Sequence, residues 1–259
     1  MKFHRSLSVA LLSVAGLGGV TLVLAAAAPE AKGTGAAFPK GNYSKLNALP
    51  DWGGVWVVGR PQAGAPPRER PAFKGDYLKR YEAWQKQVRE NNGVVTKSTS
   101  NCMPPGMPNM MGTGQYPVEF LFTPGRVTTL HEAWMQTRTI FTDGRGHPED
   151  LEPGIFGDSI GHWEGDTLVV ETVGIKTITE LGAGMKHSDK LKIMERMHLA
   201  AGDPQTLLIE TTIEDPEALE KPYKITYTYT RQRDWKLMEF ICAENDRNPV
   251  DASGHTKFE

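Results

Sequence analysis

Cysteine is scarce in this sequence, and neither sign of charge dominates it. The 259 residues include 29 Lys and Arg against 31 Asp and Glu, for a formal net charge of −2 at pH 7. No basic patch stands out, so the sequence predicts no nucleic-acid partner. With 39% hydrophobic and 23% charged residues, the composition is that of an ordinary globular protein.

The motifs of common metal and cofactor enzymes are also missing. The sequence has no His-Glu-x-x-His, no paired-cysteine motif, no Gly-rich phosphate loop between a strand and a helix, and no Ser nucleophile elbow. Scattered histidines could converge on a metal only through the fold. We therefore expect neither a metal nor a cofactor.

Long apolar runs are absent except in residues 1–28. There, Lys2 and Arg5 precede the run LSVALLSVAGLGGVTLVL, and four alanines follow it. This order is typical of a secretory signal peptide, and an uncleaved membrane anchor is the alternative. Export to the periplasm or the extracellular space is the expectation, with no stable membrane insertion after cleavage. Residues 29–50, rich in Ala, Gly and Pro, are expected to be a flexible lead-in.

The two cysteines are Cys102 and Cys242. Export brings a protein into an oxidising compartment, and an even count allows one bridge. We therefore predict a disulfide between Cys102 and Cys242, with two buried free thiols as the alternative.

Residues 51–259 are expected to form a single β-barrel domain. The segment DWGGVWVVG at 51–59 has the first strand pattern, and short strands follow one another from residue 117 to residue 242. Parallel pairing needs long crossovers, and no helix-length connection occurs after residue 117. Because closure removes exposed edges, we predict an antiparallel up-and-down β-barrel of about 8–10 strands. Residues 60–116 are a helix- and loop-bearing insertion after the first strand, with the helix at 76–93.

Charged residues share the register of apolar ones in this β-rich region. In the stretch LHEAWMQTRTI, Glu132 and Arg138 have the same parity as Leu130, Trp134 and Ile140. An unpaired buried carboxylate destabilises a fold by several kcal/mol, so these charges are expected to pair inside the barrel.

Two later strands add to this interior. Glu195 shares its parity with Ile193 and Met197, and Tyr227 alternates with outward-facing threonines. We predict one buried polar network of Glu132, Arg138 and Glu195. Two interpretations remain open: the network is structural, or it lines a cavity that holds a small ligand.

The candidate site residues follow from this interior and from the histidines. As catalytic candidates we name Glu132, Arg138, His131, His162 and His187. As ligand-binding candidates we name Glu132, Trp134, Arg138, His147, His162, Glu195 and Tyr227.

Three loops rich in Gly and Pro are expected to gather at one end of the barrel and gate it. They are residues 102–112, 143–150 and 181–190, and they carry His147 and His187. The first contains Met103, Met107, Met110 and Met111. These thioethers suit either a flexible lid over the barrel or a Cu(I) site, and the lid is the interpretation we favour.

Two resemblances add to these patterns. The Gly-x-Trp of Gly54 and Trp56 resembles the opening of the first strand in lipocalin-like (calycin) barrels, although the long insertion and the missing Thr-Asp-Tyr turn depart from that pattern. Blocks such as TPGRVTTLHE, RTIFTDGRGHP, DSIGHWEGDTLVVET and LMEFICAEN resemble those of a broad family of uncharacterised exported bacterial proteins. The second resemblance implies export and no particular activity.

From the sequence we therefore expect an exported barrel that binds a small, partly apolar molecule in its interior. One alternative is a cofactor-independent lyase, isomerase or hydrolase, with Glu132 or a nearby His as general base and Arg138 as electrostatic stabiliser. Another is a structural envelope protein with a filled core. The sequence does not predict the oligomeric state.

Overall fold

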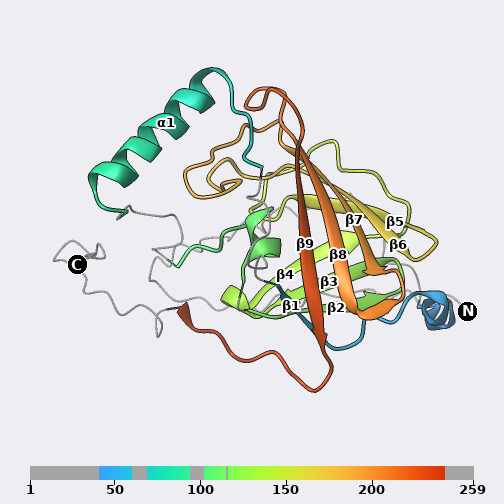
Figure 1. Cartoon of the computed structure of the whole chain (residues 1–259). Helices are drawn as coiled ribbons and strands as arrows, with labels where there is room; N and C mark the ends of the chain where they lie inside the picture. The colour runs from blue at the N-terminus through green and yellow to red at the C-terminus, as the bar shows by residue number, and fades with distance from the viewer. Residues whose placement is uncertain (1–40, 60–68, 94–101, 115, 243–259) are drawn as a thin grey trace, which may run out of the picture. The chain divides into compact units, whose positions relative to one another are not determined.

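A computed structural model of the chain describes residues 41–59, 69–93, 102–114 and 116–242. In this part of the chain, nine strands close into one barrel in sequence order (Figure 1). They are β1 (Val55–Val58), β2 (Val118–Thr123), β3 (Arg126–His131), β4 (Gln136–Phe141), β5 (Asp158–Glu164), β6 (Thr167–Val173), β7 (Lys192–Ala200), β8 (Asp203–Glu214) and β9 (Tyr223–Gln232). The prediction of a mainly β, closed barrel is confirmed.

The prediction that every strand pair is antiparallel is wrong at one place. Strands β4 and β5 pair in parallel, with Ile140 opposite Ser159, while the other neighbours, including β1 and β9, are antiparallel. In a closed ring of nine strands the number of antiparallel pairs must be even, so at least one pair has to be parallel. Residues 142–157 supply the required crossover without an α-helix.

The last expected strand, at residues 236–242, is not formed. Residues 235–241 have no regular structure, and the ring of Phe240 instead packs 5.3 Å from the rings of both Tyr116 and Trp134. The alternating hydrophobic residues of this segment therefore indicate side-chain packing, and the segment does not pair with a strand of the sheet.

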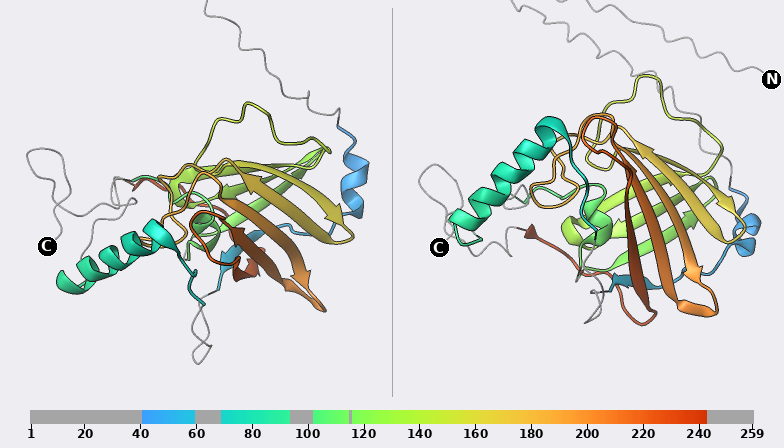
Figure 2. Two further views of the ribbon diagram at one scale, coloured as in Figure 1. Left: turned by 90° about the horizontal axis from the view of Figure 1, so that it is seen from above. Right: turned by 45° about the horizontal axis from the view of Figure 1, so that its top comes forward.

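The strand directions give the barrel two distinct ends. The tight turns β2–β3, β5–β6 and β7–β8 lie at one end, which we call the hairpin end. The insertion after β1, the β3–β4 turn and the connections after β6 and β8 lie at the opposite end, which we call the loop end. Figure 2 shows helix α1 (Gly75–Glu90) away from the hairpin tips.

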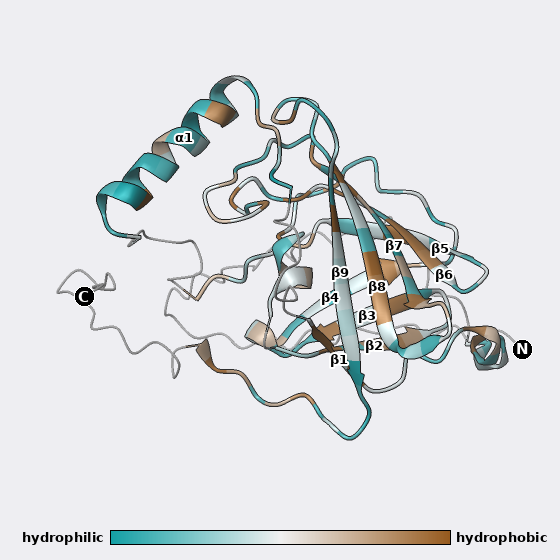
Figure 3. Ribbon diagram, viewed as in Figure 1, coloured by the Kyte–Doolittle hydropathy of each residue, from teal (hydrophilic) through white to brown (hydrophobic). Residues whose placement is uncertain are grey.

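Helix α1 is attached to the loop end by aromatic residues. The helix is predominantly hydrophilic (Figure 3), and Tyr81 is its buried residue. The Tyr81 ring lies 5.3 Å from Phe73, which bridges to Leu219 in the β8–β9 connection. Trp84 lies against Gly184, where an added Cβ would meet the indole ring at 2.2 Å. The insertion and the later loops are therefore packed together.

The barrel interior is filled mainly by side chains that alternate along the strands. On β7, Ile193, Glu195 and Met197 face inward, as the sequence predicts, and on β9 Tyr227 and Tyr229 do the same. At the hairpin end, Trp52 makes edge-to-face contacts with Phe120, Phe122 and Trp163. Aromatic side chains bury large apolar areas, about 150–250 Å² each.

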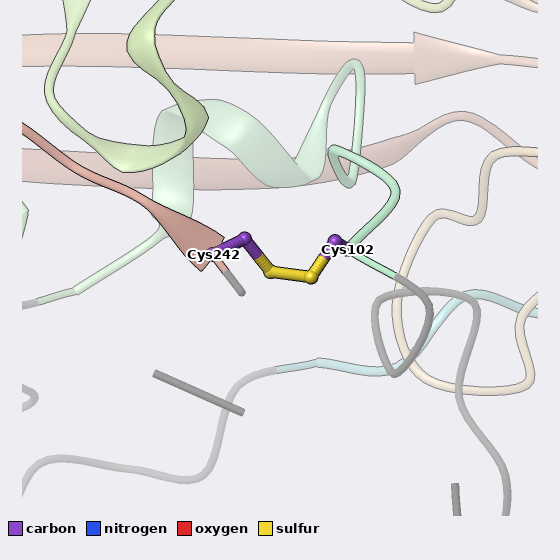
Figure 4. The surroundings of a disulfide bond; sticks show 2 residues. All are labelled: Cys102 and Cys242. Carbon is purple, nitrogen blue, oxygen red and sulfur yellow. A yellow bond between two sulfur atoms is a disulfide. The ribbon is translucent and has the colours of Figure 1, made fainter. Parts of the chain in front are cut away.

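The predicted disulfide is confirmed (Figure 4). Cys102 and Cys242 are joined with their Cα atoms 5.7 Å apart, across 140 residues of sequence. The bridge ties the segment that begins at Cys102 to the segment that follows β9.

Two expectations concern residues at the start of the chain. The signal peptide expected at 1–28 lies outside the described residues. Of the lead-in expected at 29–50, the described part begins at residue 41 and contains a short 3-10 helix, η1 (Tyr43–Ala48). In the described parts of the chain, no helix combines the length and apolar character needed to cross a membrane.

Candidate functional site

A buried ion pair between β4 and β7 is the centre of the candidate site. The guanidinium of Arg138 donates from Nη1 to Oε1 of Glu195 at 3.2 Å and from Nη2 to Oε2. The two residues are 2% and 0% exposed. Their pairing in the barrel interior confirms this part of the predicted network.

Hydroxyl groups on β5 and β6 complete the surroundings of Arg138. Its Nε donates to Ser159 Oγ at 3.1 Å, and its Nη2 donates to Thr172 Oγ1 at 2.8 Å. The two hydroxyls are themselves 2.9 Å apart and hydrogen bonded. This satisfies the buried charge and links four neighbouring strands, β4 to β7, at one level of the barrel.

One hydroxyl beside this network lacks a partner. Thr211 on β8 stands opposite Glu195 in the β7–β8 register and is 3% exposed. Its Oγ1 is buried and accepts or donates no hydrogen bond among the described residues. A buried hydroxyl without a partner costs about 1–3 kcal/mol, which is a common sign of a functional or hydrated position.

His131 lies inside the barrel near Arg138. It is 5% exposed, and its Nε2 is 3.0 Å from the hydroxyl of Thr129. Burial, and then the positive charge of Arg138, lower the pKa of His131 to about 3. The imidazole is therefore neutral at physiological pH. A general base works best when its pKa lies near the working pH, so His131 is a weak candidate for that role.

The predicted position of Glu132 is wrong. Strand β3 ends at His131, and its inward residues are Val127, Thr129 and His131. Glu132 begins a turn in which Trp134 and Met135 have positive φ. Its Oε2 accepts the backbone N–H of Met238 at 2.7 Å.

The turn therefore changes the register of the chain between β3 and β4. Arg138 still faces inward, whereas Glu132 lies outside the Arg138–Glu195 network. Trp134 packs on Phe240 at the same turn, and its buried Nε1 has no hydrogen-bond partner among the described residues.

The Met-rich segment, residues 102–112, closes the loop end. Met107, Met110 and Met111 are 0%, 2% and 1% exposed. The Tyr229 hydroxyl donates to the Met111 carbonyl, and the Tyr227 ring lies against Gly112, where an added Cβ would meet it at 2.6 Å. A loop segment, and not a strand, thus covers the inward tyrosines of β9.

The later loops hold this segment in place. The Met107 amide donates to the Ile155 carbonyl at 2.9 Å, and the Asn109 side chain donates to the Glu180 carbonyl at 2.8 Å. The acceptors Ile155 and Glu180 lie just outside the predicted loops 143–150 and 181–190, so the gathering of the three loops at one end stays a prediction. Whether they gate the barrel stays a prediction.

The histidines of these loops have different surroundings. His187 is 2% exposed, with Nδ1 2.7 Å from the Ser188 carbonyl and Nε2 3.0 Å from the Thr179 hydroxyl. A carbonyl only accepts, so Nδ1 carries the proton of the neutral ring and Nε2 accepts from Thr179. Burial lowers the pKa of His187, although the Ser188 carbonyl opposes this shift.

The other two histidines lie away from the interior. His147 contacts Asp158 at 2.5 Å and Glu171 at 3.4 Å, where the crossover passes β5 and β6. His162 is in contact with Glu164 at 3.2 Å, and its side chain is 66% exposed. Both were ligand-binding candidates, His147 at the entrance to the barrel, and neither contributes to the Arg138–Glu195 network.

The hydroxyl residues of the network, Ser159 and Thr172, are not among the candidates predicted from the sequence. Ser159 shares its parity with Trp163, and Thr172 shares its parity with Leu168 and Val170, so alternation along β5 and β6 was the available signal. Small hydroxyl residues are common on both faces of a strand, and only the fold places these two beside Arg138.

No group of three or more His, Cys, Asp or Glu side chains in the described parts of the chain is arranged to hold a metal ion. A scan against models of known protein families finds no match, and a search of curated proteins finds none either.

Proposed function

We propose that the protein binds a small, partly apolar molecule inside the barrel, admitted at the loop end. The observation that carries this proposal is the way the loop end is filled. Met107 and Met111 come from a loop segment. They fill space at the loop end, next to Tyr227 and Tyr229, that the side chains of the strands do not fill. Thioether side chains adapt to varied neighbours, so such a segment can give way to a ligand at modest cost.

The polar groups below this segment suit a ligand with a hydrogen-bonding group. Thr211 has an unused hydroxyl, and neutral His131 offers a ring nitrogen that does not carry a charge. The Arg138–Glu195 pair is already satisfied and provides a fixed wall. Apolar walls with a few placed polar groups are typical of small-molecule sites.

We further propose that the barrel is lipocalin-like and that the chain is exported. Gly54 directly precedes β1 and Trp56 lies within it, and Arg231 of β9 lies over the Trp56 ring with its Cζ 4.6 Å from the ring centroid. This contact joins the first strand to the last. The Cys102–Cys242 disulfide supports an oxidising compartment, because such bridges persist mainly outside the cytosol.

A structural protein with a filled core is the second candidate. It is favoured by the complete burial of residues such as Trp56, Ile140, Leu168 and Met197, which leaves the centre of the barrel occupied by side chains. The two candidates differ in whether the Met-rich segment can be displaced while the barrel stays folded.

Titration with the fluorescent probe 8-anilinonaphthalene-1-sulfonate distinguishes them. Tyr229→Phe removes the hydrogen bond to the Met111 carbonyl and leaves the apolar packing in place. If the segment competes with ligand, this variant binds the probe more tightly than the wild type, by about threefold to tenfold for a hydrogen bond of ~1 kcal/mol.

Tyr43→Phe is the matched control, since Tyr43 is 63% exposed and belongs to η1, away from this segment. Equal probe affinity in all three proteins, with an unchanged near-ultraviolet circular dichroism spectrum, would favour the filled-core candidate. If Tyr229→Phe instead binds the probe more tightly, mass spectrometry of molecules that co-purify with the natively produced protein would identify the ligand class.

A further inference from the structure

A hollow lies outside the barrel interior, between α1 and the loops of the loop end. It has a volume of about 580 Å³. Its lining comes from the helix, from the β6–β7 connection and from the β8–β9 connection, and consists of Tyr77, Arg80, Thr177, Lys186, His187, Ser188, Asp189 and Glu217. We call it the helix hollow. Its volume lies within the range of small-molecule sites.

Buried hydrogen bonds hold the wall of the helix hollow. Asp215 accepts the backbone N–H and the hydroxyl of Ser188, each at 2.7 Å, and its Oδ1 also accepts the backbone amides of Glu217 and Ala218. His187 is fixed between Thr179 and the Ser188 carbonyl. The shape of this wall is thus set before any ligand arrives, which lowers the entropy lost on binding.

The facing wall is also anchored. Trp84, one turn beyond Arg80, packs against Gly184, and the Tyr81 ring stacks on the Trp84 ring with centroids 6.0 Å apart. These contacts position Tyr77 and Arg80 over the loops. The Arg80 guanidinium carbon lies 5.6 Å from the centroid of the Tyr77 ring.

The charges on the lining balance. Two of its residues are cationic, Arg80 and Lys186, and two are anionic, Asp189 and Glu217. Lys186 is paired with Glu180 at 2.7 Å, and Asp189 lies 3.4 Å from Lys190. By contrast, neither Arg80 nor Glu217 forms an ion pair within 4.0 Å with any other residue in the ranges that the structure describes.

Arg80 and Glu217, the two lining charges without an ion pair in the described part of the chain, both line the hollow together with Tyr77. Burial raises the pKa of Tyr77, the carboxylates of Asp215 and Glu217 raise it further, and the positive charge of Arg80 opposes the shift. Arg80 and Glu217 are exposed and form no ion pair with each other, so both charged groups are accessible to a ligand. A ligand that carries both charges satisfies both residues, whereas a ligand with one charge leaves the other residue unmatched.

We propose that the helix hollow binds a small zwitterion, the class of molecule to which free amino acids belong. Arg80 binds its carboxylate by charge-assisted hydrogen bonds, and Glu217 binds its ammonium group. The half-buried Tyr77 ring contacts its apolar part. This site is separate from the barrel interior, and the inference does not depend on the function proposed above.

Isothermal titration calorimetry with three matched probes tests the proposal. Phenylalanine carries both charges, phenethylamine lacks the carboxylate, and 3-phenylpropionate lacks the ammonium group. Because the three probes share the same ring, differences in affinity report the charges. We expect phenylalanine to bind, and each singly charged probe to bind about tenfold more weakly or not at all.

Substitutions assign the binding to the helix hollow. Arg80→Gln and Glu217→Gln are each expected to weaken phenylalanine binding by about tenfold, which is the effect of losing one charge-assisted contact. The matched controls are Arg89→Gln, also on α1, and Glu220→Gln, in the β8–β9 connection, because both residues are exposed and lie outside the lining. These controls are expected to bind as the wild type does.

Three results would overturn the proposal. One is the absence of phenylalanine binding to the wild-type protein at millimolar concentration. Another is equal affinity for the three probes, and the third is wild-type affinity in both Arg80→Gln and Glu217→Gln. All four variants change exposed side chains, and an unchanged melting temperature verifies their folding. Failure here leaves the probe titration of the barrel interior unaffected, so the two proposals are tested separately.

Discussion

Arg138 of β4 and Glu195 of β7 form an ion pair inside the barrel, although 57 positions separate them in the sequence. The Arg138 guanidinium donates hydrogen bonds to the hydroxyls of Ser159 and Thr172 as well as to the Glu195 carboxylate. In a barrel interior this arrangement is stable only while both charges are present.

We therefore expect single substitutions of the pair to be far more damaging than a joint one. Glu195→Leu or Arg138→Met alone leaves an uncompensated buried charge and should lower the free energy of unfolding by about 3–5 kcal/mol. The double variant should lose less than either single variant. Urea unfolding followed by circular dichroism measures all three, and Glu132→Leu is the matched control because Glu132 lies outside the network.

A loss in the double variant equal to the sum of the two single losses would contradict this account. The pair would then be energetically independent, which its geometry does not permit at 0% and 2% exposure.

The disulfide should provide a large share of the stability. Closing a loop of 140 residues lowers the entropy of the unfolded chain, which corresponds to at most about 5 kcal/mol for a bridge of this span. Cys102→Ser together with Cys242→Ser should lower the free energy of unfolding toward that limit. The reduced wild-type protein should match the double variant in the same denaturant titration, and a difference between them would show that the serines themselves perturb the fold.

His131 should make the protein less stable in acid. Its pKa in the folded protein is about 3, against 6.5 as its ordinary value, so between these pH values the unfolded chain binds a proton that the folded protein does not. Stability from this group is present above pH 6.5 and is lost as the pH falls toward 3. The expected loss between pH 7 and pH 5 is about 2 kcal/mol.

His131→Gln should flatten this part of the stability profile, whatever it does to the stability at pH 7. His162→Gln is the control, because that side chain is 66% exposed. His187, whose pKa is also lowered, contributes with the same sign and remains in both variants. An unchanged slope in His131→Gln would show that this imidazole is not held neutral in the fold.

The Met-rich segment should be sensitive to one glycine. Gly106 has a φ of +66°, and an added Cβ would lie 2.4 Å from the Ile155 carbonyl oxygen. Gly165 has a φ of +59°, but a Cβ added to it would have no other atom within 4 Å. Gly165→Ala should therefore show only the conformational cost, about 1–2 kcal/mol.

Gly106→Ala should exceed that cost, because the backbone of residues 102–112 must move away from Ile155. Thermal unfolding of both variants gives the comparison. Proteolysis with trypsin is not informative for this segment, as it has no Lys or Arg, whereas hydrogen exchange of the Met107 amide reports its bond to Ile155 directly. Equal melting temperatures of the two variants would mean that the segment is loosely seated.

Local patterns were sufficient for several features. Alternation along β7 and β9 identified Glu195, Tyr227 and Tyr229 as inward-facing, because side chains of a strand alternate between its two faces. Two cysteines in a chain with an export pattern allowed a single pairing. The succession of short strands with tight turns indicated a barrel.

The errors arose where the chain changes direction. The prediction carried one parity from Leu130 to Ile140 across two neighbouring strands. The turn at Trp134 and Met135 breaks that parity, so Glu132 is not on the face on which Arg138 lies. A parallel pair such as β4–β5 is required because the closed ring has an odd number of strands. The number of strands cannot be read from any short segment of the sequence.

The sequence by itself determined the barrel class, the inward faces of its long strands and the cysteine pairing, since each depends on periodicity or on a count of residues. Only the tertiary structure decided that Arg138 meets Glu195, Ser159 and Thr172, that Met107 and Met111 fill the loop end, and that Arg80 and Glu217 face one hollow. These relationships join residues far apart in the chain, and they exist only after closure of the barrel sets the register of every strand against its neighbours.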